Sequence, residues 1–164
     1  MRTLGLLSLA FLIASISTVR ASAKDEGFSG RWVLDKSQPS PNAPDNLEIR
    51  IKQDGSGVSM ECTFKEPENG IVPLLYLGIM TSKMHLSLDG NAQQNQIGPF
   101  QMASKTTLNG NQMDTEWTAA VKDDQVQGHW KHTLSDDGRH MTLEIKESST
   151  QGQSGQATLH FVRK

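Results

Sequence analysis

The 164-residue sequence contains a single cysteine, Cys62, so it has no intramolecular disulfide framework. Its stability must come from an ordinary packed core. Cys62 alternates with the apolar residues Val58, Met60 and Phe64, a pattern that predicts a small buried hydrophobe. A reactive thiol is the alternative, but it needs a basic or polar setting that the sequence neighbours of Cys62 do not reveal.

Clusters of basic residues are also missing. The chain has 16 Lys and Arg residues against 18 Asp and Glu, which gives a formal net charge of −2. A mildly acidic chain without a basic patch argues against nucleic acid as a partner. It also argues against adhesion to an anionic membrane surface.

No apolar run is long enough for a comfortable transmembrane helix. Residues 1–23 have the pattern of a secretory signal peptide, with Arg2, an apolar stretch over 4–16, and Ala21-Ser22-Ala23 at a cleavage site. An uncleaved membrane anchor is the alternative. The segment carries Arg2 and Arg20, so its removal lowers the basic count from 16 to 14 and takes the net charge from −2 to −4. We expect an exported monomer, periplasmic or secreted, with one domain over 24–164.

Motifs for catalysis and for cofactor binding are absent from the sequence. There is no Gly-x-Ser-x-Gly elbow, no reactive-cysteine signature, and no Walker-type or dinucleotide glycine motif. The five histidines show no ligand spacing typical of zinc or copper, and His129 and His132 fall on opposite faces of one strand. We predict no metal site, no cofactor and no enzymatic activity.

The sequence does contain four Asx-Gly dipeptides, which readily adopt the positive φ angles of tight hairpin turns. They are Asp54-Gly55, Asp89-Gly90, Asn109-Gly110 and Asp137-Gly138. Apolar and polar residues alternate around most of them, and no convincing amphipathic helix is present. Nine strands are expected, over 30–34, 47–53, 58–65, 83–88, 100–108, 113–121, 126–134, 139–145 and 157–162. This spacing predicts an all-β protein, an antiparallel up-and-down barrel of about eight to nine strands.

The residues expected to face the interior mix large apolar side chains with small or polar ones. A small barrel is either filled by its own side chains or holds one small ligand, and the alternation permits both. If a cavity exists, its candidate lining residues are Phe100, Met102, Ser104, Thr115, Trp117, Trp130 and His132. An inward histidine is commonly a hydrogen-bonded core residue, and His132 is also the polar group best placed to orient a ligand.

The most apolar stretch outside the leader, residues 71–80, does not alternate. Pro73 and Gly78 weaken any regular element there, which favours a capping segment. A buried plug at one barrel end is one interpretation. The others are a lid over a ligand cavity, formed by Leu74, Leu75, Tyr76 and Leu77, or a surface that contacts a partner.

The start of the expected domain, Phe28-Ser29-Gly30-Arg31-Trp32, resembles the opening of lipocalin-like proteins, which carry Gly-x-Trp on the first barrel strand. The stretch also looks like small exported bacterial proteins of lipocalin-like type. The resemblance implies that Trp32 closes one barrel end and that Arg163, after the last strand, packs across it. It further implies a binding protein for a small apolar molecule, without identifying the ligand.

Three functional hypotheses follow. The first is an exported lipocalin-like protein that binds a small hydrophobic or amphipathic ligand. The second is a secreted interaction or inhibitor module, in which the barrel is a scaffold and the loops over 36–45 and 66–81 engage another protein. The third is an enzyme built in the cavity, which would need His132 beside another inward polar group.

Overall fold

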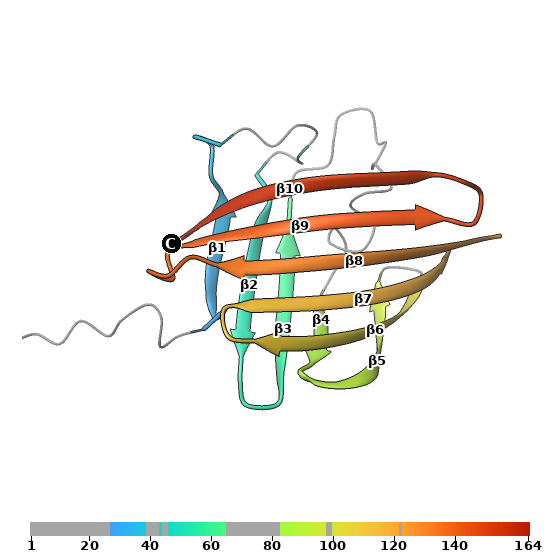
Figure 1. The fold of residues 1–164 in the computed structure, drawn as a ribbon, viewed down its shortest axis with the longest axis horizontal. Helices are drawn as coiled ribbons and strands as arrows, with labels where there is room; N and C mark the ends of the chain where they lie inside the picture. Colours follow the sequence, from blue (N-terminus) through green and yellow to red (C-terminus); the bar gives the residue numbers. More distant parts are fainter. Residues whose placement is uncertain (1–26, 39–42, 44–45, 65–82, 98–99, 122) are drawn as a thin grey trace, which may run out of the picture.

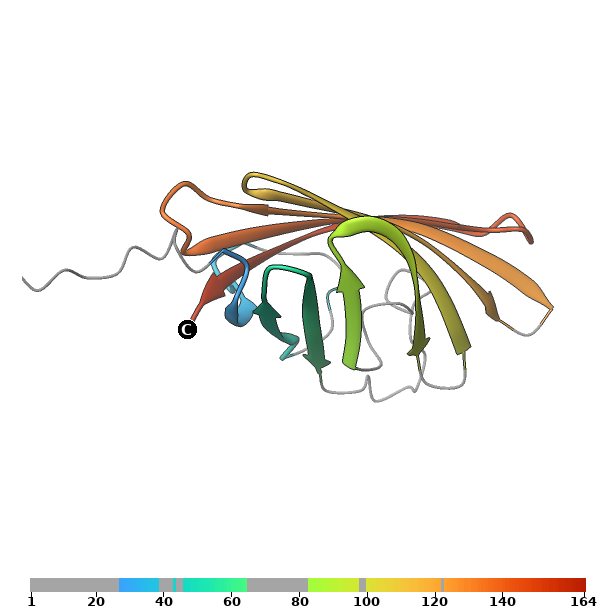
Figure 2. The same cartoon turned by 90° about the horizontal axis from the view of Figure 1, so that it is seen from below.

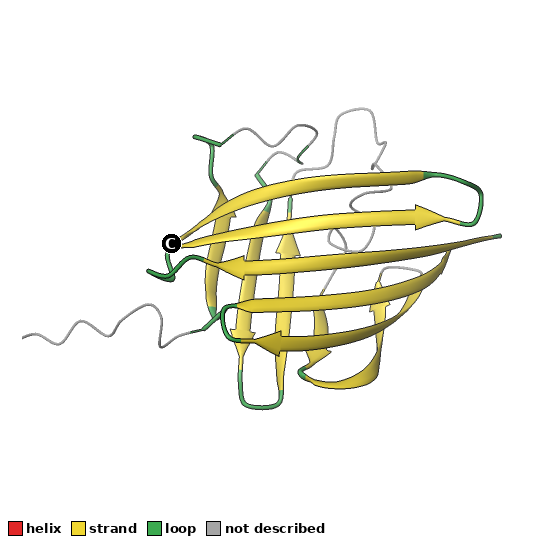
Figure 3. Ribbon diagram, in the orientation of Figure 1, coloured by secondary structure: helices red, strands yellow, loops and turns green. Residues whose placement is uncertain are grey.

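The computed structural model describes residues 27–38, 43, 46–64, 83–97, 100–121 and 123–164, and these form strands and turns with no helix (Figure 3). The signal peptide expected over 1–23 and the lid expected at Leu74, Leu75, Tyr76 and Leu77 lie outside the described residues. The strands are β1 (Gly30–Leu34), β2 (Glu48–Gln53), β3 (Gly57–Thr63), β4 (Lys83–Ser87), β5 (Asp89–Ile97), β6 (Phe100–Asn109), β7 (Gln112–Val121), β8 (Asp124–Leu134), β9 (His140–Ser149) and β10 (Ser154–Arg163).

All ten strands belong to one antiparallel sheet, in the order β4-β3-β2-β1-β10-β9-β8-β7-β6-β5. The first strand, β1, pairs with the last, β10, and Val33 lies opposite Val162 in this pair. The long strands β6 to β10 run crosswise to the short strands β1 to β4, so the sheet wraps into a nearly closed barrel (Figure 1). The predicted all-β antiparallel barrel is confirmed, with ten strands instead of eight to nine.

Three of the four Asx-Gly dipeptides reverse the chain as predicted. Gly90, Gly110 and Gly138 have φ angles of 76°, 60° and 67°. Glycine adopts such positive φ angles readily, whereas residues with a side chain do so at a cost. The fourth turn is built differently, since Gly55 does not adopt a positive φ. There the Asp54 carboxylate accepts hydrogen bonds from the backbone N–H groups of Ser56 and Gly57, at 2.8 and 2.9 Å. Hydrogen bonds to the Asp54 side chain thus stabilise this turn, which has no glycine with a positive φ angle.

The strand that sequence patterning missed is β5. Its sequence, Asp-Gly-Asn-Ala-Gln-Gln-Asn-Gln-Ile, shows no apolar alternation. Only Asn95 and Ile97 are buried, and the pairing with β6 shifts register between Asp89 and Ala92. An edge strand with one short buried stretch does not need an apolar face along its whole length, so its polar sequence resembles a loop.

Asn95 links the two end strands of the sheet. Its side-chain oxygen accepts a hydrogen bond of 2.8 Å from the backbone N–H of His85 in β4. Its side-chain nitrogen donates to the Ser104 hydroxyl in β6 at 3.4 Å. Figure 2 shows β4 and β5 standing side by side beneath the turn that joins them. The Asn95 side chain thus joins β5 to β4, where the two ends of the sheet meet. We call this junction the seam.

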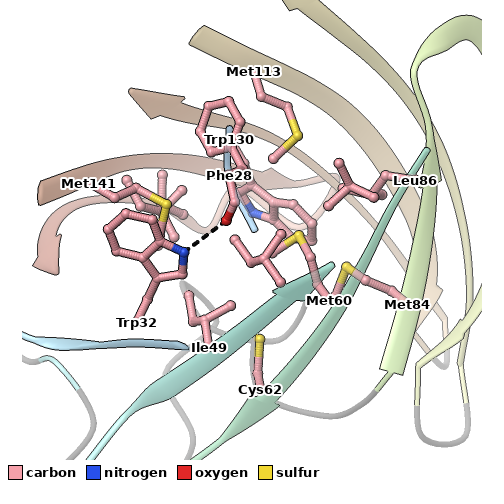
Figure 4. Packing of buried hydrophobic residues seen from close by; sticks show 14 of the residues in the cluster. Phe28, Trp32, Ile49, Met60, Cys62, Met84, Leu86, Met113, Trp130 and Met141 are labelled. Atoms are coloured by element: carbon pink, nitrogen blue, oxygen red, sulfur yellow. Dashed lines mark hydrogen bonds between the residues drawn. The ribbon is translucent and has the colours of Figure 1, made fainter. Parts of the chain in front are cut away.

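One end of the barrel is closed by packing around Trp32. The Trp32 indole N–H donates to the Phe28 carbonyl oxygen at 2.9 Å, and both side chains are buried (Figure 4). The Arg163 guanidinium carbon lies 4.6 Å from the centre of the Trp32 ring. Arg163 also donates to the Gly27 carbonyl oxygen at 2.6 Å, which ties the last strand to the segment before the first.

Candidate ligand-binding site in the barrel interior

The structure places most of the candidate cavity residues on the inner face of β6, β7 and β8. Their side chains alternate with outward polar ones along each strand, as the period of two requires. The buried members are Met102, Ser104, Thr115, Trp117, Trp130 and His132. Phe100, at the start of β6, is only half-buried and lies at the edge of this set.

The strand register brings part of this set into one row across the sheet. Ser104 lies opposite Trp117, Trp117 opposite Gly128, and Gly128 opposite Glu147. Gly128 has no side chain, and the Trp117 indole covers it, since a Cβ on Gly128 would lie 2.3 Å from the Cε2 atom of Trp117. Trp130 is one inward position along β8, and its ring centre is 5.3 Å from that of Trp117.

Sequence reasoning missed Glu147, which lies at the end of this row. Its side chain continues the inward series Met141, Leu143 and Ile145, and the residue is only 4% exposed. The strand was expected to end at Ile145, whereas it runs to Ser149. Extending the alternation by one period would have identified an inward carboxylate.

The environment of Glu147 disfavours its charged form. Neither carboxylate oxygen has a hydrogen-bond partner among the described residues. Burial raises the pKa of Glu147 to about 8, and the neighbouring Trp130 indole offsets a part of that rise. The Trp117 and Trp130 indole N–H groups are likewise buried and make no hydrogen bond of acceptable geometry within the described chain.

The inward hydroxyl groups of this region have partners. The Thr106 and Thr115 hydroxyls lie 3.0 Å apart and share a hydrogen bond. Ser104 accepts from the Asn95 side chain. Buried polar groups are normally paired in this way, so the unpaired atoms around Glu147 need an explanation, as do the two ring nitrogens of His132, which also make no hydrogen bond within the described chain.

His132 lies nearer the closed end and is fully buried. Its ring meets that of Phe28 edge to face, with centres 6.4 Å apart. Burial lowers the pKa of His132 to about 4, against smaller opposing effects of Asp114 and the Met113 backbone. His132 is thus a neutral imidazole that packs on Phe28 in the core of the closed end. His129 lies on the other face of the same strand, and its Nε2 atom is 3.2 Å from the Asp114 Oδ1 atom.

Methionine side chains form a large share of the interior wall. Five are at most 3% exposed, and several converge on the region between the two crossed halves of the sheet (Figure 4). They are Met60, Met84, Met102, Met113 and Met141. Unbranched thioether chains adapt to irregular shapes, so this wall can accommodate differently shaped apolar groups.

Two hollows lie outside the barrel. One, of about 620 Å³, is open and crosses β5 to β9, where the outward residues Lys105, Glu116, His129 and Lys146 line it together with the row Ser104, Trp117, Gly128 and Glu147. The other, of about 840 Å³, lies between β1 and the segment that follows it, and Arg31, Asp35 and Glu48 are among its lining residues. Both are open to solvent.

Metal-binding clusters are not found in the part of the chain that the structure describes: no three His, Cys, Asp or Glu residues come together there. Cys62 is buried, and burial raises the pKa of its thiol to about 12. Within the same residues, no helix has the length and apolarity needed to cross a bilayer.

Comparison with known proteins identifies the fold. No family model matches the chain, and no curated protein sequence is significantly similar to it, so the resemblance to exported bacterial proteins has no support from sequence comparison. A secretory abundant heat soluble (SAHS) protein from Ramazzottius varieornatus superposes with a TM-score of 0.51 at 10% identity, over 83% of this chain and 94% of that one. SAHS protein 4 from the same organism superposes with a TM-score of 0.50 at 14% identity, over 85% and 96%. These likenesses show a lipocalin-like barrel fold.

Proposed function

We propose that this protein is an exported lipocalin-like binding protein that holds a small amphipathic molecule inside its barrel. The observation that carries the proposal is the group of buried polar atoms on Trp117, Trp130 and Glu147 that lack partners in the described chain. An unpaired buried polar group costs roughly 1–3 kcal/mol, and more when it is charged. A bound molecule with a polar head would supply the missing interactions.

The surroundings of these polar atoms suit the rest of such a molecule. Small-molecule sites are mostly apolar, with a few convergent polar groups that fix orientation. Here the apolar part is the methionine-rich wall together with Ile145 and Val126, both buried. The closed end around Trp32 and Phe28 would form the floor of the site, and residues 74–77 remain our predicted lid.

Export is supported by the signal-peptide pattern of residues 1–23. Two proteins with the same barrel are described as secretory, which agrees with an exported role for the fold. We propose no reaction, since His132 packs as a core residue and no second inward catalytic group accompanies it among the described residues.

Native mass spectrometry of protein purified from its own exported fraction tests the proposal. We expect a reproducible added mass that organic solvent removes. Titration of the solvent-washed protein with a fluorescent apolar probe should then quench or shift the Trp117 and Trp130 emission. A clean apo mass together with no response to the probe would contradict interior binding.

The second candidate is an interaction module that uses the outside of the barrel. It is favoured by the 840 Å³ hollow beside residues 35–38, because this hollow adjoins the proline-rich connection that we expect to engage a partner. If the apo mass is clean, a charge-reversing pair at this hollow, Arg31→Glu with Lys36→Glu, should weaken association with a partner and leave the barrel folded.

A further inference from the structure

We infer that the 620 Å³ hollow across β5 to β9 is a second binding site, and that its ligand is an acidic oligosaccharide. Two lysines of the hollow would hold carboxylates of this ligand, and neutral polar side chains would meet its hydroxyl groups. The inference does not rest on the proposed function, because the site is on the outer face of the barrel and needs no cavity inside it.

The hollow is organised around one row of outward residues. Strand register places Lys105 opposite Glu116, Glu116 opposite His129, and His129 opposite Lys146. The two lysines are on β6 and β9, three strand spacings apart, so their backbones are separated by about 14 Å along the sheet. A ligand that contacts both lysines must therefore be extended, as a short oligomer is.

The charges in this row favour an anion. Lys105 and Lys146 are exposed, and neither forms an ion pair with a described residue. By contrast, Lys131 in the neighbouring outward row is 3.9 Å from Glu144, which also points outward. With histidine counted as neutral, the outward lining residues carry two lysines and one acid, Glu116, a net charge of +1 in a chain of formal charge −2.

Neutral polar groups form the next outward row of the hollow. Thr118 lies opposite Gln127, and Gln127 lies opposite Ser148. The Gln127 side-chain nitrogen donates to the Ser148 hydroxyl at 3.2 Å, which orients the amide and leaves its oxygen as an acceptor. The exposed Thr118 hydroxyl makes no hydrogen bond within the described chain. Both groups can therefore exchange hydrogen bonds with the hydroxyl groups of a sugar.

The hollow also has a suitable size and floor. Its volume of about 620 Å³ is on the scale of small-molecule sites. Ala92, Ala103 and Gly128 are among its lining residues, and their small size leaves the surface of the sheet accessible between the longer side chains.

Other anions fit the hollow less well. Single-stranded nucleic acids bind in basic grooves with aromatic side chains on which the bases stack. Here the one described lining residue with a large aromatic ring is Trp117, which is buried with its side chain on the inner face. An acidic peptide would use the two lysines, but its backbone and carboxylates offer no hydroxyl groups to Thr118 and Gln127.

Amide NMR titration of the mature protein at low salt tests the inference with three tetramers: tetragalacturonate, neutral maltotetraose and tetraglutamate. We expect tetragalacturonate to bind about tenfold more tightly than either of the others, with the largest shifts at the amides of Thr118, Gln127 and Lys146. Added salt should weaken this binding, since exposed charges are screened. Lys105→Gln and Lys146→Gln should each weaken it about threefold to fivefold, the range of an exposed ion pair.

Lys52→Gln is the matched control, because Lys52 is exposed on β2 and does not line the hollow. It should leave the affinity for tetragalacturonate unchanged. No binding of tetragalacturonate, or binding that neither substitution in the hollow weakens, would overturn the inference. Equal affinity for tetraglutamate would show that charge alone is recognised, and it would overturn the assignment to a carbohydrate. None of these outcomes affects the interior site, which the apolar probe tests separately.

Discussion

At the scale of single residues, the interior is defined by contacts that one substitution can change. Gly128 permits the Trp117 indole to lie flat across β8, and Trp32 donates its indole N–H to a buried carbonyl. Both are side-chain contacts of a kind that alternation alone does not reveal. The sequence predicted that Trp117 and Trp32 face inward, but it did not show what each would touch.

Gly128→Ala should displace the Trp117 indole. The added Cβ would lie 2.3–2.5 Å from three indole atoms, closer than packed atoms come. Overpacking of this kind costs about 1–3 kcal/mol, so urea denaturation should show a loss of that size and the tryptophan emission of the folded state should shift. Gly55→Ala is the control, because no atom lies within 4 Å of its Cβ position. A folded-state emission unchanged in Gly128→Ala would argue against the contact.

Trp32→Phe should destabilise the closed end. The substitution leaves the buried Phe28 carbonyl oxygen without its 2.9 Å donor and removes the larger ring under Arg163. A buried acceptor without a partner costs about 1–3 kcal/mol. Trp130→Phe serves as the comparison, since its indole N–H makes no such bond within the described chain. Equal losses of unfolding free energy in the two variants would show that the Trp32 hydrogen bond contributes nothing.

At the scale of elements, the sequence predicted nine strands, and their core segments are confirmed. Alternation identifies a strand where one face is buried along its length, as in Met113, Thr115 and Trp117 of β7. It fails at β5, whose buried residues are confined to one end. It also ended β9 two residues before Glu147, because a carboxylate on an inner face breaks the expected apolar pattern. The part of the candidate site that was missed is therefore its most unusual group.

Asn95→Ala tests the bridge across the seam. The change removes the acceptor for the His85 backbone N–H, 2.8 Å away, and the donor to Ser104. A loss of about 1–3 kcal/mol is expected for the unsatisfied donor, together with faster hydrogen exchange at the His85 amide. Gln94→Ala, at the neighbouring exposed position, should change neither quantity. An unaltered exchange rate at His85 in Asn95→Ala would show that the seam does not depend on this side chain.

At the scale of the whole molecule, two buried groups of the described chain, His132 and Glu147, have shifted pKa values between about 4 and 8, and their effects on stability oppose each other. His132 lies toward the closed end with a pKa lowered to about 4, and Glu147 lies in the row of Trp117 and Gly128 with a pKa raised to about 8. At pH values between its folded and unfolded pKa, each group is neutral in the folded protein and charged in the unfolded chain. Together they determine how unfolding free energy varies with pH near neutrality.

The sign of each contribution follows from which state binds more protons. His132 has an unfolded pKa near 6.5, so the unfolded chain binds the extra proton between pH 6.5 and about 4, and stability falls with acidification. Glu147 has an unfolded pKa near 4.5, so the folded chain binds the extra proton between pH 4.5 and about 8, and stability falls as pH rises. The two slopes cancel between about 4.5 and 6.5, and above 6.5 Glu147 acts alone.

We therefore expect the unfolding free energy of the ligand-free protein to fall by about 2 kcal/mol from pH 6.5 to 8, at about 1.4 kcal/mol per pH unit. Urea denaturation at closely spaced pH values measures this. Glu147→Gln should flatten the decline, because the amide carries no titratable proton, while Glu144→Gln should keep it. A wild-type curve already flat over this range would mean that the Glu147 carboxylate is ionised inside the barrel, with a compensating group that the described residues do not supply.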